Sequence, residues 1–177
     1  MRLCQPGWRL PVGAAAVLLA LLGPPAPCRA QPVQAGLAAA AVPIELAISG
    51  RVEQPRTLAL ADLQALPPVV VEVTYATARG PQAATYTGAL LWSLLTAAAP
   101  VDEPGRNTHL RHTLLAHGKD GYAVAVAIGE LDPHMEGKQV IVAYAQDGKP
   151  LPSLRLVVPG DSHAGRSVRD LVSIEVR

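Results

Sequence analysis

The chain has 177 residues, of which 50% are hydrophobic, 3% aromatic and 16% charged. This composition favours one compact domain and argues against intrinsic disorder. The formal net charge of +1 excludes the broad basic surface that nucleic-acid-binding domains carry. Because phenylalanine is absent, we expect leucine, valine, isoleucine and alanine to fill the core.

The first 30 residues have the layout of a secretory signal peptide. Two arginines supply a positive start, residues 10–22 form an apolar run rich in alanine and leucine, and small residues stand at the end of the segment. The run of about 13 residues is shorter than the roughly 20 that a membrane-spanning helix needs. We therefore predict a signal peptide over 1–30, a short flexible tail over 31–42 and one periplasmic domain over 43–177. An uncleaved membrane anchor is the alternative.

Cleavage after residue 30 would remove both cysteines, Cys4 and Cys28, together with three arginines and no acidic residue. The mature chain would then carry 12 basic and 14 acidic residues, a formal charge of −2, and no thiol. Such a chain forms no disulfide, no cysteine-ligated metal site and no cysteine nucleophile. Its length allows a hydrophobic core to hold it together, since about two-thirds of the unfolded surface is buried at this size.

Most of the domain consists of short alternating or β-branched segments separated by turns. They predict strands over 44–48, 56–60, 69–75, 85–87, 110–116, 122–128, 140–145, 154–158 and 172–176. A first short helix is predicted after Asp62 as its N-cap, and a second over 90–95 with leucines at helical spacing, ended by Pro100. Many strands and one or two short helices predict a mainly β domain with helices at its margins.

Five histidines invite a metal hypothesis; they are His109, His112, His117, His134 and His163. His109 and His112 lie three positions apart in or beside a predicted strand, where such side chains point to opposite faces. No zinc-type spacing with acidic residues occurs. We therefore interpret the histidines as surface residues on loops.

The segment 159–169 combines two glycines with Arg166 and Arg169 directly after a predicted strand. Glycine-rich backbone can turn its amides toward an anion, and arginine is a planar bidentate donor. The segment is therefore either a solvated surface turn or a loop that binds a phosphate, a carboxylate or a polar heterocycle. A second polar segment, 77–82, leaves the predicted strand 69–75 and is expected to be a loop.

Seven segments also follow one another in a characteristic order: 48–55, 58–67, 86–95, 117–122, 142–152, 155–160 and 165–169, the last ahead of 174–176. In this order they resemble the molybdopterin-binding domain of the sulfite oxidase family, over about residues 43–177. The resemblance implies an α+β fold with a mainly β core, a mixed sheet and a few short helices.

In the family's enzymes, a cysteine from the loop after the strand 69–75 ligates molybdenum. This chain has no cysteine there, and Tyr75 to Thr77 occupies the equivalent region. A thiolate is a soft ligand that neither threonine nor tyrosine replaces well. The resemblance therefore implies a pterin or molybdopterin ligand, with no molybdenum and no catalytic or metal-ligating residue. The implied binding residues are Tyr75, Thr77, Arg79, Asp161, His163, Arg166, Ser167 and Arg169.

Individual roles follow from the same resemblance. Arg166 stands where the family's Gly-x-Lys-Ser-Val-Lys loop has its first lysine, and Arg79 matches the basic residue after the missing cysteine. Tyr75 could stack on a pterin ring, and the carboxylate of Asp161 could accept hydrogen bonds from the ring edge. We expect Trp92 and Tyr122 to pack in the fold instead, since each lies in a patterned element.

Three functions remain open at this point. The first is an exported pterin-binding module, because cysteine-lacking, single-domain relatives look like pterin-binding proteins and some report to membrane signalling proteins of cyclic-di-GMP metabolism. The second is a molybdenum-dependent oxidoreductase or a subunit of one. The third is a ligand-free interaction domain. None of the three involves nucleic acid or a segment that spans a membrane.

Overall fold

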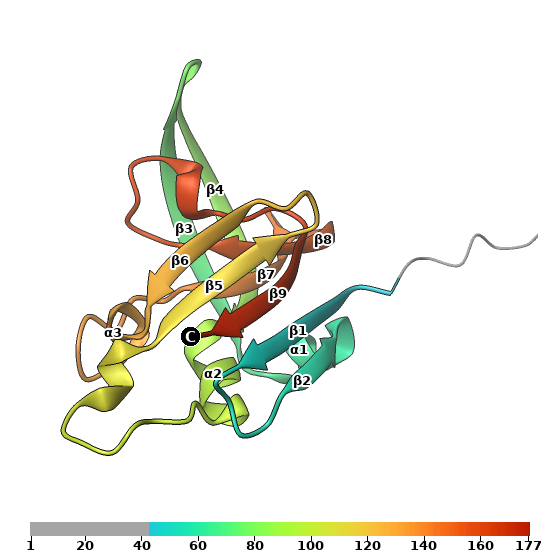
Figure 1. Cartoon of the computed structure of the whole chain (residues 1–177). Coiled ribbons are helices and arrows are strands. Elements are labelled where there is room, and N and C mark those ends of the chain that lie inside the picture. The colour runs from blue at the N-terminus through green and yellow to red at the C-terminus, as the bar shows by residue number, and fades with distance from the viewer. Residues whose placement is uncertain (1–42) are drawn as a thin grey trace, which may run out of the picture. The chain divides into compact units, whose positions relative to one another are not determined.

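The computed structural model describes residues 43–177, so the predicted signal peptide and tail lie outside the described residues. Within this range the structure has nine strands and five short helices (Figure 1). No helix within it is long and apolar enough to cross a membrane. The elements in chain order are β1 (Glu45–Gly50), β2 (Arg56–Ala59), α1 (Leu60–Ala65), β3 (Pro68–Thr77), β4 (Gly80–Leu90), α2 (Leu91–Ala98), the 3-10 helix η1 (Thr108–Arg111), β5 (Thr113–Gly118), β6 (Ala123–Ala127), α3 (Ile128–Leu131), β7 (Ile141–Gln146), β8 (Lys149–Val157), the 3-10 helix η2 (Ala164–Arg166) and β9 (Leu171–Val176).

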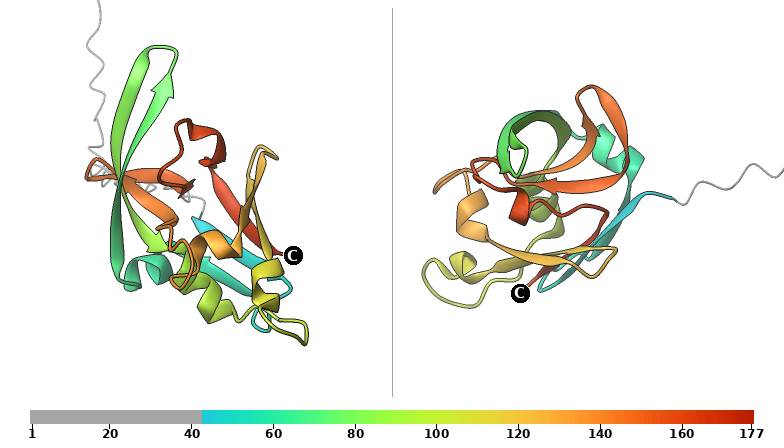
Figure 2. Two further views of the ribbon diagram at one scale, coloured as in Figure 1. Left: turned by 90° about the vertical axis from the view of Figure 1, so that its left-hand side faces the viewer. Right: turned by 90° about the horizontal axis from the view of Figure 1, so that it is seen from above.

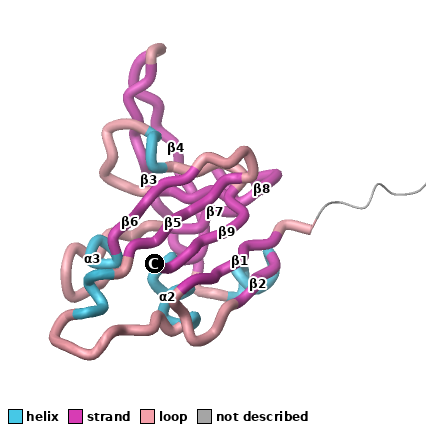
Figure 3. Tube along the Cα trace, in the orientation of Figure 1, coloured by secondary structure: helices cyan, strands magenta, loops and turns pink. Residues whose placement is uncertain are grey.

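The strands form two sheets (Figure 3). One has five strands in the order β2-β1-β9-β5-β6, and the other has four in the order β3-β4-β7-β8. β1 and β9 pair in parallel, whereas their other neighbours pair antiparallel. Each predicted strand corresponds to one strand of the structure. The α+β, mainly β fold with a mixed sheet is therefore confirmed.

The main core lies between the inner face of the five-stranded sheet, helix α2 and part of the four-stranded sheet. Alternation along β1 buries Leu46 and Ile48, which are 0% and 1% exposed. Leu91 and Leu95 lie four positions apart on one face of α2 and are equally buried. Each such side chain contributes about 1.5–3 kcal/mol on burial. Aliphatic residues therefore form the core of a protein without phenylalanine, as the composition predicted.

Helix α1 begins earlier than predicted. Asp62 does not cap it but lies in its first turn, where its Oδ2 accepts a hydrogen bond of 2.8 Å from the backbone N–H of Ala59. A carboxylate there satisfies an otherwise unpaired amide and complements the helix dipole. Helix α2 confirms the second prediction and ends at Ala98; its C-cap residue Ala99 adopts a left-handed conformation with φ 53° before Pro100.

The segment 77–82 is not a loop. β3 and β4 continue as one long antiparallel hairpin up to the pair Thr77 and Gly80, with only Ala78 and Arg79 at the turn. Figure 2 shows this hairpin projecting from the rest of the domain. Gly80 adopts a φ of +99°, which a glycine allows at no steric cost. The hydroxyl of Thr77 closes the turn by donating to the carbonyl of Gly80 at 2.7 Å.

Candidate functional site

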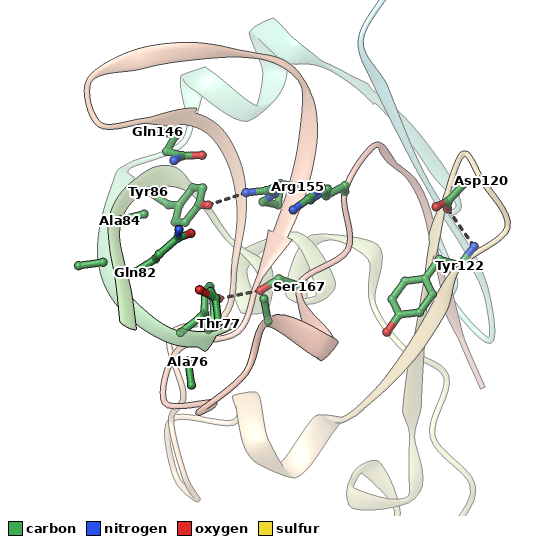
Figure 4. A pocket seen from close by; sticks show the side chains of 14 residues that line it. Ala76, Thr77, Gln82, Ala84, Tyr86, Asp120, Tyr122, Gln146, Arg155 and Ser167 are labelled. Atoms are coloured by element: carbon green, nitrogen blue, oxygen red, sulfur yellow. Dashed lines mark hydrogen bonds between the residues drawn. The ribbon is translucent and has the colours of Figure 1, made fainter. Parts of the chain in front are cut away.

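A cavity of about 570 Å³ lies between the four-stranded sheet, the turn between β5 and β6, and the segment 159–170 before β9 (Figure 4). Its volume suits a small organic ligand. The residues that line it are Tyr75, Ala76, Thr77, Gln82, Ala83, Ala84, Tyr86, Asp120, Tyr122, Gln146, Arg155, Ala164, Ser167 and Arg169.

Strand alternation builds the sheet wall of the cavity. Gln82, Ala84 and Tyr86 lie two positions apart on β4, so their side chains share one face. The pairing register places Tyr75 of β3 opposite Gln82, and Gln146 of β7 opposite Tyr86. This wall therefore offers phenol and amide groups beside a flat position at Ala84.

The hydroxyls of Tyr75 and Ser167 join the sheet wall to the 159–170 segment. They share a hydrogen bond of 2.7 Å. Burial raises the pKa of Tyr75 above its ordinary value, and the bond to Ser167 offsets only part of that effect. Tyr75 is therefore a neutral phenol at physiological pH, able to donate or accept one hydrogen bond but not to supply charge.

Two arginines give the cavity positive charge. Arg155 on β8 donates a hydrogen bond of 2.5 Å to the hydroxyl of Tyr86, and its guanidinium carbon lies 5.5 Å from the centre of the Tyr86 ring. Arg169 is exposed, and within residues 43–177 neither arginine forms an ion pair. Asp120 is the one acidic residue among those that line the cavity. The site therefore favours an anionic ligand.

Arg166 does not line the cavity. Its guanidinium donates to both carboxylate oxygens of Asp161, at 2.6 and 2.9 Å, and to both of Glu130 in α3, at 2.9 and 3.2 Å. Burial disfavours the ionised form of Glu130, but the hydrogen bonds from Arg166 and Lys138 outweigh it and hold the pKa of Glu130 below its ordinary value. The hydrogen bonds that Arg166 donates to Asp161 and Glu130 likewise raise the pKa of Arg166. Arg166 therefore anchors the 159–170 segment to α3.

The structure brings together half of the residues that the sequence predicted. Tyr75, Thr77, Ser167 and Arg169 line the cavity, whereas Arg79, Asp161, His163 and Arg166 do not. Of the latter four, Arg79 lies at the hairpin turn, and Asp161 is paired with Arg166. The Nδ1 of His163 lies 3.2 Å from the carbonyl oxygen of Ala76 and ties the segment to β3.

Sequence reasoning missed several residues of the cavity. Arg155 carried a usable signal, because a charged residue between the apolar Leu154 and Leu156 points to the opposite side of its strand from the core. The expectation that Tyr122 packs in the core was wrong. Tyr122 is 48% exposed, lines the cavity, and donates a hydrogen bond of 2.5 Å to the carbonyl of Gly165. It follows the turn at Gly121, just outside β6, so strand alternation does not govern it.

The histidines do not assemble a metal site. Within residues 43–177 no group of three histidine, cysteine, aspartate or glutamate side chains could hold a metal ion. The interpretation of His112 as a surface residue was wrong, since its side chain is 3% exposed. Its Nε2 lies 2.8 Å from Asp102, and its Nδ1 lies 3.2 Å from the carbonyl of Arg177, so it joins η1 to the end of β9.

Comparison with known proteins identifies the family. A family model described as "Oxidoreductase molybdopterin binding domain" matches residues 38–177. The chain belongs to this family. Among solved structures it is similar to the sulfane dehydrogenase SoxCD from Paracoccus pantotrophus, with a TM-score of 0.61 and 19% sequence identity. That match covers 75% of this chain and 38% of the other, so the chain spans less than half the length of this neighbour. No curated protein matches the chain.

The cavity of this molybdopterin-binding domain fits the organic part of its family's cofactor. Molybdopterin combines a flat heterocycle with a phosphate, and the cavity combines phenols and amides with two arginines that form no ion pair within residues 43–177. The same residues do not fit a molybdenum ion ligated by the protein. The only cysteines of the sequence are Cys4 and Cys28, so residues 43–177 offer no thiolate ligand.

Proposed function

We propose that residues 43–177 are an exported binding module that holds a pterin or molybdopterin without a protein thiolate on molybdenum. The observation that supports this is the cavity of about 570 Å³, which joins two arginines to neutral hydrogen-bonding groups in a domain without cysteine. Membership of the molybdopterin-binding family points to the same ligand class.

Arg155 and Arg169 are the residues that would hold the anionic group, since their guanidinium donors face the cavity without a carboxylate partner in the described chain. The hydroxyls of Tyr75 and Ser167 would add neutral hydrogen bonds. The half-exposed ring of Tyr122 would cover one face of the heterocycle. When bound, molybdopterin supplies dithiolene sulfurs as its own metal ligands.

In this proposal, the predicted signal peptide over 1–30 would direct the module to the periplasm. A module that binds its ligand without turnover acts through a partner protein that recognises the occupied state. The family resemblance points to the periplasmic part of a membrane signalling protein as that partner. Ligand occupancy would then be the signal that this partner receives.

Native mass spectrometry of the chain purified from a periplasm tests the proposal. An added mass that matches a pterin or molybdopterin without molybdenum would support the binding module and identify the ligand. Molybdopterin with molybdenum would support the second candidate, an oxidoreductase subunit, which the family's description as an oxidoreductase favours. A chain that carries no ligand and whose melting temperature is indifferent to added pterins would contradict both and support the interaction domain.

Arg155→Met tests whether Arg155 holds the anionic group of the ligand. Loss of a charged hydrogen bond costs about 1.5–3 kcal/mol, so we expect affinity for the anionic ligand to fall roughly 10- to 150-fold. Arg106→Met is the control, because Arg106 is an exposed arginine outside the cavity. Equal affinities of the two variants would contradict the assignment of the anion site.

A further inference from the structure

Two glutamines lie on the sheet wall of the cavity, Gln82 on β4 and Gln146 on β7 (Figure 4). Between them lies Ala84, whose single methyl group leaves the wall flat. Ala84 is two positions from Gln82 and two from Tyr86, the residue opposite Gln146. Since a strand rises about 3.4 Å per residue, about 7 Å separates Ala84 from each neighbour on its face. A bicyclic ring seated over Ala84 would bring its edges within reach of both amides.

Both glutamines keep unused hydrogen-bonding groups. Within residues 43–177 the side chain of Gln82 forms no hydrogen bond, and the Nε2 of Gln146 donates only to Asp147, at 3.2 Å. A carboxamide offers a donor and an acceptor side by side, whereas a guanidinium only donates. The amides therefore complement a neutral edge on which a carbonyl and an N–H are adjacent. The arginines of the cavity cannot recognise that edge with the same selectivity.

We propose that Gln82 and Gln146 select the ring of the ligand by hydrogen-bonding an amide-like edge. The site then takes a planar heterocycle with adjacent donor and acceptor atoms in preference to an aromatic anion of the same size. This inference rests on the proposed function, in which the arginines hold the anionic group. The arginines contribute affinity for any small anion, and the glutamines distinguish between rings because an apolar edge leaves their amides unpaired.

Two bicyclic carboxylates test this division, pterin-6-carboxylate with an amide edge and 2-naphthoate without one. The full sequence is expressed, and the chain purified from the periplasm is freed of small molecules and titrated with each compound. We expect Gln82→Met and Gln146→Met each to weaken pterin-6-carboxylate about two- to tenfold, the effect of one neutral hydrogen bond. The Kd for 2-naphthoate should not rise, because the amide that is removed forms no hydrogen bond with this compound. Gln64→Met, at an exposed position of α1 outside the cavity, should change neither Kd.

The outcomes separate this inference from the proposed function. If the unsubstituted chain binds pterin-6-carboxylate but both cavity variants keep the same ratio of the two Kd values, the glutamines do not select the ring, and the binding module stands. If the unsubstituted chain binds neither compound, the proposed function fails and this inference fails with it. Equal losses of both compounds in the glutamine variants would show a general disturbance of the cavity and would also overturn the assignment. Circular-dichroism melting of each variant confirms that it is folded.

Discussion

Arg166→Ala distinguishes an anchoring role from a ligand-binding role for the residue that the sequence motif singled out. The substitution leaves the carboxylates of Asp161 and Glu130 without their shared cation. The side chains of Arg166, Asp161 and Glu130 are 33%, 18% and 24% exposed. Exposed ion pairs contribute up to about 1 kcal/mol, whereas breaking buried pairs costs about 3–5 kcal/mol. For this half-buried network we expect a loss of about 2 kcal/mol. At roughly 3–5 °C per kcal/mol for a domain of this size, the Tm falls by roughly 6–10 °C.

The loss should depend on pH in a defined direction. The pKa of Glu130 in the folded chain lies below its ordinary value of 4.5, because bonds from Arg166 and Lys138 outweigh the effect of burial. A lowered folded-state pKa stabilises the protein above the unfolded pKa, and this stabilisation is lost as pH falls through the folded pKa. The difference in Tm between the unsubstituted chain and Arg166→Ala should therefore be full at pH 7 and shrink below about pH 4.5. Thermal melts of both chains, followed by circular dichroism at pH 7 and below about pH 4.5, measure this difference in Tm.

Arg111→Ala is the control for this experiment. Arg111 is 70% exposed and bonds one carboxylate, that of Glu103, at 3.2 Å. Its removal should cost less than about 1 kcal/mol. The reasoning would be refuted if Arg166→Ala melted within about 1 °C of the unsubstituted chain yet bound the ligand at least about tenfold more weakly. Arg166 would then be a ligand residue and not an anchor.

Three further predictions follow from the geometry of the cavity. Tyr75→Phe removes the hydroxyl that bonds Ser167, and should lower the free energy of unfolding in urea by about 0.5–1.5 kcal/mol. Gly118→Ala should lower the free energy of unfolding by about 1–3 kcal/mol in the same assay, because the added Cβ would lie 2.9 Å from the carbonyl oxygen of Arg169. Gly165→Ala is its control, since the added Cβ meets open space and should change that free energy by less than about 0.5 kcal/mol. Arg169→Met should weaken anion binding and make its Kd less sensitive to salt, as measured by titration at two ionic strengths.

Hydrophobic patterning predicted where the strands lie along the chain, because apolar residues alternate with polar or small ones in a half-buried strand. It could not predict the hairpin of β3 and β4 beyond Tyr75. The segment 77–82 contains glycine and proline, which are typical of loops, yet the pairing of ten residues on each strand outweighs that local preference. Asp62 shows a second limit. An acidic residue near a helix start is as compatible with the first turn as with the N-cap, and only the backbone contact at Ala59 distinguishes them.

The loop motif predicted where the cavity lies but not which of its arginines are available to a ligand. Arg166 and Arg169 look alike in the sequence, and no pattern shows that a carboxylate 36 positions away binds the first and not the second. Arg155 was missed because it lies outside the loop motif, within an apolar strand. Its position at the cavity depends on how β8 pairs with β7. Ligand sites built from several strands and one loop are therefore only partly visible in a sequence.

Three contacts join β3 to the 159–170 segment at the edge of the cavity. The backbone N–H of Ala76 donates to the carbonyl of Ser162 at 2.8 Å, His163 contacts the carbonyl of Ala76, and Tyr75 bonds Ser167. These bonds are made by the protein alone, so they reduce the ordering of the segment that ligand binding would otherwise have to supply. A ligand at 100 times its Kd would then add about 2.7 kcal/mol of stability to a fold that is already formed.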